Sequence, residues 1–155
     1  MVQAVLDSAL LHADETAWPE HGRPLWLWVF RSLTVTLYYV AGRGKERVEN
    51  VLDGFSGWLM SDGWMAYRDY PRRLRCWAHL IRKARGLAES CDREARVFGQ
   101  RVLTTLEVLM AAVYAAREGP LPVDWPTQHA SRVAALRAAC ERHQGSDQVE
   151  STEVV

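Results

Sequence analysis

The fold is decided by residues 10–16, LLHADET, an apolar run that ends in two adjacent carboxylates. A second stretch, residues 58–63, WLMSDG, has the same form and closes on Asp62. Both runs predict short buried strands. Acids at the ends of neighbouring strands bring oxygen ligands together around hard divalent cations. Asp14 and Asp62 are therefore predicted to form half of a metal site.

Asp14 has a rival for this role in its neighbour Glu15. Successive side chains of a strand point to opposite faces of the sheet. His12 and Asp14 then share one face, whereas Glu15 shares the other face with Ala13. This alternation favours Asp14 as the metal ligand and leaves Glu15 open. Because a lone carboxylate at a strand end is most often a turn or helix cap, the hypothesis depends on the pair.

Length and charge limit what can be built around these strands. With 155 residues, 48% of them hydrophobic, the chain has the size of one domain with a real core. Lys+Arg and Asp+Glu number 19 each, so net charge indicates neither a nucleic-acid nor a membrane partner. Three widely spaced cysteines fit a reducing compartment, and the cytoplasm is expected. No stretch approaches the roughly 20 apolar residues that cross a bilayer, so no membrane partner is expected.

The hydrophobic pattern predicts an α/β chain whose elements follow the order βββαβαβ. Strands are expected at 10–16, 25–31, 34–40, 58–62 and 72–77, and helices at 45–55, within 63–69, and from 79 to about 90. A helical crossover suits a parallel connection, so the first and fourth strands would lie side by side with their acids together. Trp26, Trp28, Trp58 and Trp77 fall in predicted strands and are expected to fill the core.

The C-terminal third changes to helical spacing. Apolar residues from Ala95 to Ala116 recur every three or four positions and predict one long amphipathic helix over residues 93–117. A second helix is expected over about 127–142, with Val133, Leu136 and Cys140 facing the first. The predicted organisation is a partial core at 1–90, a helical insertion or arm at 91–145 and a disordered tail at 146–155.

One basic cluster stands out in this neutral chain. Between residues 68 and 85, seven basic residues and one acid give a local charge of +6. The cluster is a candidate phosphate-binding face. The plainer interpretation is a solvated helix face beside an edge strand. The residues predicted to contact DNA are Arg72, Arg73, Arg75, His79, Arg82 and Lys83.

Four motifs carry a family resemblance: HADET at 12–16, LWLWV at 25–29, SDGWxAY at 61–67 and CWAHLxR at 76–82. In this order and approximate spacing, over about residues 10–87, they resemble the insertion-sequence sixty-six family of bacterial transposases. The resemblance implies a ribonuclease H-like mixed sheet with a C-terminal helical insertion or arm, and a DDE triad in which Asp14 and Asp62 are the first two acids. It also implies Mg²⁺ (or Mn²⁺) as cofactor, and transposon ends and target DNA as partners. The expected reaction is metal-dependent DNA strand cleavage and transfer.

The resemblance ends before the third acid of the triad. In the family this acid follows the helical insertion, in a segment resembling Asn-Asn-x-Ala-Glu-Arg, and nothing in residues 93–155 matches it. Glu107, Glu141, Glu150 and Glu153 lack the neighbouring residues, so none of them takes the role. We therefore expect the central fragment of a transposase, from a partial reading frame or a decayed copy. Its two-metal site is expected only in the complete protein, and its enzymatic activity is left open.

Two other functions remain open. One is a different ribonuclease H-like nuclease that uses Asp14 and Asp62, with or without Glu15. The other is a catalytically dead remnant that binds DNA or self-associates as a homo-oligomer through the apolar stripe from Phe98 to Val113. Such a stripe is more often plain core.

Overall fold

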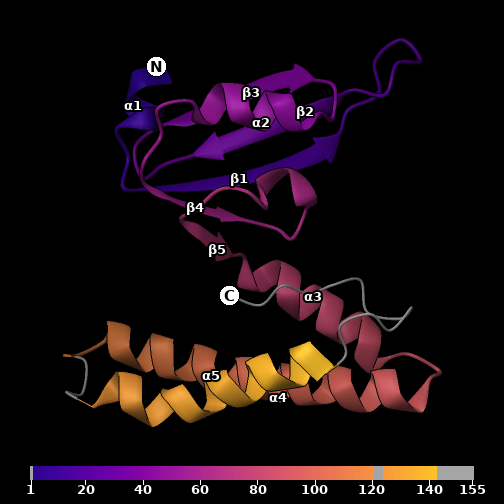
Figure 1. Ribbon diagram of the computed structural model, residues 1–155, viewed down its shortest axis with the longest axis vertical. Coiled ribbons are helices and arrows are strands. Elements are labelled where there is room, and N and C mark those ends of the chain that lie inside the picture. The colour runs from indigo at the N-terminus through magenta and orange to yellow at the C-terminus, as the bar shows by residue number, and fades with distance from the viewer. Residues whose placement is uncertain (1, 121–123, 143–155) are drawn as a thin grey trace. The chain divides into compact units, whose positions relative to one another are not determined.

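A computed structural model describes residues 2–120 and 124–142 of the chain. The chain divides into two compact units, with the boundary between Cys76 and Trp77. The first, here called the sheet unit, contains all five strands, and the second, the helical unit, contains the three longest helices (Figure 1). Helix α3 thus belongs to the helical unit, whereas the proposed core was predicted to extend to residue 90. The predicted tail at 146–155 lies outside the described residues.

The sheet unit is built on a five-stranded mixed sheet. Its strands are β1 (Leu10–Ala17), β2 (Trp26–Arg31), β3 (Thr36–Ala41), β4 (Trp58–Ser61) and β5 (Arg73–Arg75). They lie in the order β3-β2-β1-β4-β5. β1 pairs with β2, and β2 with β3, in antiparallel fashion, whereas β4 runs parallel to β1 and β5 parallel to β4. The predicted mixed α/β fold is therefore confirmed at this level.

Three helical segments accompany the sheet: α1 (Val2–Leu6), α2 (Lys45–Leu52) and the 3₁₀ turn η1 (Met65–Tyr67). α2 forms the crossover between β3 and β4, which allows β4 to return parallel to β1. The predicted crossover and the short turn after Asp62 are both present. The sequence did not predict α1.

The core of the sheet unit follows the alternation of β1. Leu11 and Ala13 are buried, whereas His12 and Asp14 are exposed. The buried face of the sheet packs against apolar residues of α1, α2 and η1, and this core consists of Val5, Leu11, Ala13, Trp28, Phe30, Val48, Leu52, Phe55, Leu59, Ala66 and Tyr67. One expectation is corrected, since β1 does not end at its acids. It continues to Ala17 because residues from Asp14 onward keep pairing with β2.

The tryptophans are less uniformly buried than predicted. Trp28 is fully buried, but Trp58 is 48% exposed. The reason is the pleat: in β4 it is Leu59 that faces the core, so Trp58 points to the opposite face. Trp26 and Trp77 are half-buried.

The helical unit contains α3 (Trp77–Ala88), α4 (Arg93–Arg117) and α5 (Trp125–Arg142). Its core combines residues from all three helices: Leu80, Ala84, Phe98, Val102, Leu106, Leu136, Ala139 and Cys140. The long helix begins at residue 93 because the Asp92 carboxylate accepts a hydrogen bond of 2.7 Å from the backbone N–H of Ala95, an N-cap. Both long helices were predicted, although Val113 and Val133 are partly exposed rather than packed.

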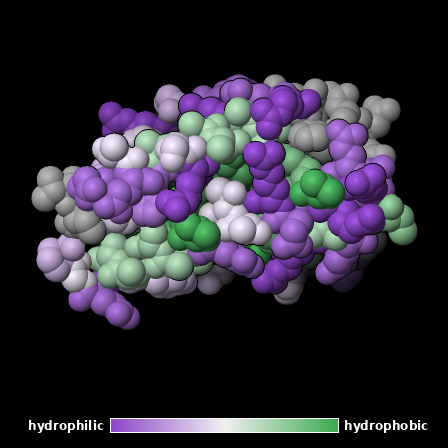
Figure 2. All heavy atoms as spheres, turned by 90° about the horizontal axis from the view of Figure 1, so that it is seen from below, coloured by the Kyte–Doolittle hydropathy of each residue, from purple (hydrophilic) through white to green (hydrophobic). Residues whose placement is uncertain are grey.

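The stripe on α4 is mostly core. Phe98, Val102, Leu106 and Leu109 are all buried. By length and composition α4 could also cross a membrane, the one such helix in the described part of the chain, which corrects the expectation that no stretch would qualify. The core helix of a soluble protein passes the same test, and 22% of the apolar window of α4 is buried. Hydrophobic patches nevertheless interrupt the polar surface on the face viewed in Figure 2.

Candidate functional site

The parallel pairing of β1 and β4 determines how the two predicted acids lie. The register aligns Leu10 with Trp58 and His12 with Met60. Continued by two residues, it brings Asp14 level with Asp62 on neighbouring chain segments. Both carboxylates also act electrostatically on the same phenol, that of Tyr67. The continued register and the shared influence on Tyr67 indicate that the two acids lie near each other, although Asp14 lies within its strand and Asp62 just after its own.

Asp62 stabilises the turn that follows β4. Its Oδ1 accepts a hydrogen bond of 2.8 Å from the backbone N–H of Trp64. The next residue, Gly63, lies directly against the guanidinium of Arg75, so that a side chain at Gly63 would collide with it. Arg75 is 7% exposed, on the edge strand β5. The carboxylate of Asp62 is therefore held by its own turn and is half-buried, and the buried guanidinium of Arg75 lies against the next residue of that turn.

Asp14 lies on the exposed face of β1. Its Oδ1 accepts a hydrogen bond of 3.0 Å from the backbone N–H of Glu15. His12 shares this face, as the alternation predicted. Asp14 is accordingly accessible from solvent, as a ligand to an incoming cation must be.

Glu15 has the opposite environment, with a side chain only 2% exposed. Its Oε1 forms an ion pair of 3.0 Å with the guanidinium of Arg43, and its Oε2 accepts a hydrogen bond of 2.9 Å from the hydroxyl of Tyr67. The Arg43 guanidinium lies over two indole rings, 4.0 Å from the centroid of Trp26 and 4.5 Å from that of Trp64. Both carboxylate oxygens of Glu15 therefore have protein partners.

The electrostatics of this cluster follow from burial and the three negative charges. Burial raises the pKa of Glu15, the hydrogen bonds from Arg43 and Tyr67 oppose that rise, and the charge of Asp62 adds to it. Burial also raises the pKa of Tyr67, and the charges of Glu15, Asp62 and Asp14 raise it further. Tyr67 therefore stays a neutral donor, hydrogen-bonded to Glu15 and influenced by the charges of Asp62 and Asp14.

Sequence reasoning missed Arg43 and the role of Tyr67. Tyr67 belongs to the SDGWxAY motif, and Arg43 lies between the strand predicted at 34–40 and the helix predicted at 45–55. One signal was available: a glutamate placed by strand alternation on the core face must have a polar partner there. Which residue would be that partner depended on tertiary structure.

The predicted DNA contacts fall on both sides of the boundary between the units. In the sheet unit, Arg72 is exposed and donates a hydrogen bond of 2.9 Å to the carbonyl of Ser56, Arg73 is half-buried and Arg75 is buried. In the helical unit, α3 carries a half-buried His79 and the exposed side chains of Arg82 and Lys83. The six residues thus differ widely in exposure, and their contacts with DNA stay predictions.

The donor set can be tested against a divalent cation. Across residues 2–120 and 124–142, no group of three or more His, Cys, Asp or Glu side chains is arranged to hold a metal ion. Mg²⁺ is, however, commonly bound through one or two carboxylates and takes its other ligands from water and phosphate. Two hard carboxylates, one in β1 and one directly after the neighbouring strand β4, fit that mode of binding. They do not form a closed protein cage.

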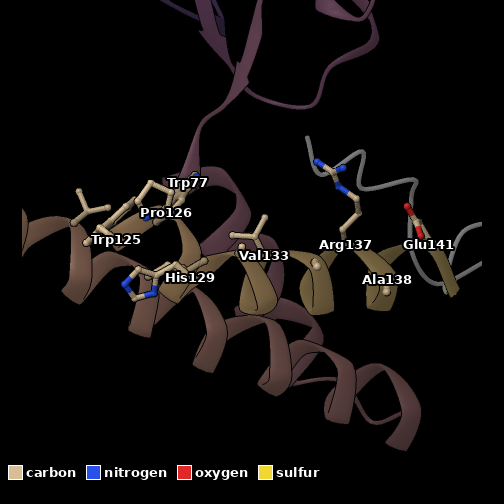
Figure 3. A pocket seen from close by; sticks show the side chains of 12 residues that line it. Trp77, Trp125, Pro126, His129, Val133, Arg137, Ala138 and Glu141 are labelled. Carbon is tan, nitrogen blue, oxygen red and sulfur yellow. The ribbon is translucent and has the colours of Figure 1, made fainter. Parts of the chain in front are cut away.

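A separate groove lies in the helical unit, with a volume of about 540 Å³ (Figure 3). Trp77, Trp125 and Pro126 gather at one end, and Arg137 and Glu141 lie further along α5. Its lining is mainly apolar. Sequence analysis did not predict this groove, because its residues come from three helices.

The mixed sheet and its acid pair define an α/β protein with a candidate carboxylate site on neighbouring parallel strands. Comparison with protein families gives a match to the one described as "Transposase IS66 family" over residues 1–150. Because this match covers nearly the whole chain, the protein belongs to the IS66 transposase family. Comparisons with curated proteins and with solved structures gave no significant match.

Proposed function

We propose that the sheet unit contributes the first two acids, Asp14 and Asp62, to the catalytic core of a DDE transposase. The observation that carries this proposal is the β1–β4 register, because its continuation beyond His12 and Met60 would align Asp14 with Asp62. Membership of the transposase family supports it. The strand arrangement supports a ribonuclease H-like core, since three antiparallel strands are followed by a helical crossover and two parallel strands.

The proposed chemistry is cleavage and transfer of a DNA strand. Divalent metal, Mg²⁺ or Mn²⁺, would supply Lewis-acid activation of the attacking oxygen and stabilisation of the leaving oxygen. Asp14 would offer its carboxylate from the exposed face of β1, and Asp62 from the turn that its own hydrogen bond to Trp64 holds in place. We assign the third acid of the triad to no residue of this chain, and a two-metal site is proposed only for the complete protein.

DNA is the proposed partner, and the exposed basic side chains are its proposed contacts. Arg72 lies at the edge of the sheet unit, and Arg82 and Lys83 lie on α3. Contacts of this kind hold phosphates without reading sequence. Binding is therefore expected to weaken as salt rises, and replacing Arg82 and Lys83 with alanine should weaken it and flatten the salt dependence. Replacing Arg93 and Arg101, exposed on α4, serves as the matched control.

The metal site is tested by titrating the full chain with Mn²⁺ and counting free Mn²⁺ by electron paramagnetic resonance. Asp14→Asn and Asp62→Asn should each abolish most of the binding, because each removes one of two charged ligands. Asp53→Asn, which changes an exposed acid of the same unit, should leave it unchanged. Equal Mn²⁺ binding by wild type and both site variants would reject the acid pair. If DNA binding then persists without metal, the catalytically dead remnant is the better description.

A cytoplasmic location is proposed along with this activity. Cys76, Cys91 and Cys140 are free thiols, as a reducing compartment would keep them. Self-association through the α4 stripe gains no support, since most of that stripe is buried within the helical unit.

A further inference from the structure

We propose that Glu15, Arg43 and Tyr67 form a positioning network that holds the turn after Asp62 against β1 and so sets the spacing between Asp14 and Asp62. None of the three is proposed to touch metal or DNA. This inference rests on the proposed function, because it concerns the same acid pair.

The network joins three segments that are distant in sequence. Glu15 lies in β1, Arg43 in the connection between β3 and α2, and Tyr67 in η1. Glu15 accepts a hydrogen bond of 3.0 Å from Arg43, which is 28 residues away in sequence, and one of 2.9 Å from Tyr67, which is 52 residues away. Each of these contacts satisfies one oxygen of a nearly inaccessible carboxylate. Removing either would leave a buried polar group without its partner, which is costly enough to hold the segments together.

Arg43 is fixed by more than its charge. Its guanidinium lies over the rings of Trp26 and Trp64, at 4.0 Å and 4.5 Å from their centroids. Trp26 belongs to β2, whereas Trp64 belongs to the turn after Asp62. Arg43 therefore connects that turn to the sheet through a second route, independent of Tyr67.

The turn held in this way is the one that carries Asp62. Tyr67 packs edge-on against Trp64, with ring centroids 5.8 Å apart. The backbone N–H of Trp64 donates a hydrogen bond of 2.8 Å to Oδ1 of Asp62. A continuous path thus leads from Glu15, adjacent to Asp14, through Tyr67 and Trp64 to Asp62. Because Glu15 and Asp14 are consecutive in a paired strand, fixing the turn on Glu15 fixes Asp62 with respect to Asp14.

The same contacts argue against Glu15 as a metal ligand. Its side chain lies on the core face of β1, whereas Asp14 lies on the exposed face. Both of its oxygens are occupied by protein donors. Groups that orient ligands in this way typically change metal affinity by about 10- to 100-fold when they are lost.

The test uses the full chain and Mn²⁺ as the probe. Tyr67→Phe and Glu15→Gln should each weaken Mn²⁺ binding about 10-fold. The double variant should be little weaker than either single one, since residues that act as a unit are not additive. Tyr70→Phe is the matched control: its hydroxyl makes two partly buried hydrogen bonds, of 3.0 Å to the carbonyls of Phe55 and Gly57, and neither involves the acids. Tyr70→Phe should bind Mn²⁺ as wild type does.

A second measurement needs no metal. Hydrogen exchange of the Trp64 amide should be about 10-fold faster in Tyr67→Phe than in wild type, and unchanged in Tyr70→Phe. Arg43→Lys, at the more exposed end of the network, keeps the charge but loses the stacking, and should show the same two effects to a smaller degree. Arg43→Lys therefore still tests the network if Tyr67→Phe or Glu15→Gln fails to fold.

Several outcomes would overturn the inference. One is that Tyr67→Phe and Arg43→Lys bind Mn²⁺ with wild-type affinity, although Asp14→Asn loses binding. Another is that Glu15→Gln loses Mn²⁺ binding as completely as Asp14→Asn does, whereas Tyr67→Phe binds Mn²⁺ normally. That result would make Glu15 a metal ligand. If Asp14→Asn and Asp62→Asn bind Mn²⁺ normally, the proposed function fails instead. Exchange of the Trp64 amide then decides alone whether the network holds the turn.

Discussion

Replacing Gly99 with alanine tests how closely α3 and α4 pack in the helical unit. Gly99 lies in α4, and a Cβ at this position would stand 2.7 Å from the carbonyl oxygen of Ala84 and 2.8 Å from the carbonyl carbon of Leu87, with the backbone nitrogen of Ala88 closer still. All three atoms belong to the backbone of α3. They cannot move aside by changing a rotamer, so the helices themselves would have to separate.

The expected size of the effect follows from two opposing terms. Alanine in a helix interior is favoured over glycine by roughly 1 kcal/mol. Against this, ordinary contact begins at 3.4 Å, so the added Cβ needs at least about 0.7 Å more room at the Ala84 oxygen, and more still at the Ala88 nitrogen. Overpacking of this kind costs about 1–3 kcal/mol, and backbone neighbours place Gly99→Ala at the upper end. The net loss in the free energy of unfolding should be about 2 kcal/mol.

Gly86→Ala provides the matched control, because it makes the same change inside α3 with open space around the added methyl group. It should stabilise the protein by about 0.5–1 kcal/mol. Urea unfolding followed by circular dichroism at 222 nm compares the two variants, since most of the helical signal comes from this unit. Stabilisation by Gly99→Ala similar to that of Gly86→Ala would show that the two helices are not in such close contact.

Two further predictions concern titratable groups. Burial raises the pKa of Tyr39 to about 12, whereas an unfolded tyrosine ionises near pH 10. The free energy of unfolding should therefore fall as pH rises from about 10 to about 12. Urea unfolding at pH 9 and 11 should show a smaller fall in Tyr39→Phe, but not in Tyr38→Phe, whose side chain lies on the exposed side of β3. Equal pH dependence in both variants would contradict the assignment. Burial and the charge of Glu141 raise the pKa of the Cys140 thiol, so at pH 8 a disulfide reagent should modify exposed Cys91 rapidly and Cys140 only as the helical unit opens. Unchanged rapid labelling in a Cys91→Ser variant would count against this.

Much of the fold could be predicted because local patterns agreed with the tertiary structure. The strands at 25–31 and 34–40 and the helix at residues 93–117 follow directly from hydrophobic spacing, and the crossover between β3 and β4 follows from chain connectivity. Where the prediction differed, a tertiary contact decided. β1 extends past Asp14 because β2 pairs with it as far as Ala17, and Trp58 is exposed because the pleat of β4 turns Leu59 inward.

The candidate site also has one part that the sequence predicts and one part that depends on tertiary contacts. Alternation in β1 separates Asp14 from Glu15, and that separation needs only the sequence, since neighbouring strand residues face opposite ways. What Glu15 does on its own face needs the three-dimensional structure, because its partners lie 28 and 52 residues away. A buried carboxylate could not persist there without Arg43 and Tyr67. The core-facing acid of the pair is therefore better suited to hold the site together, and the exposed acid to bind the cation.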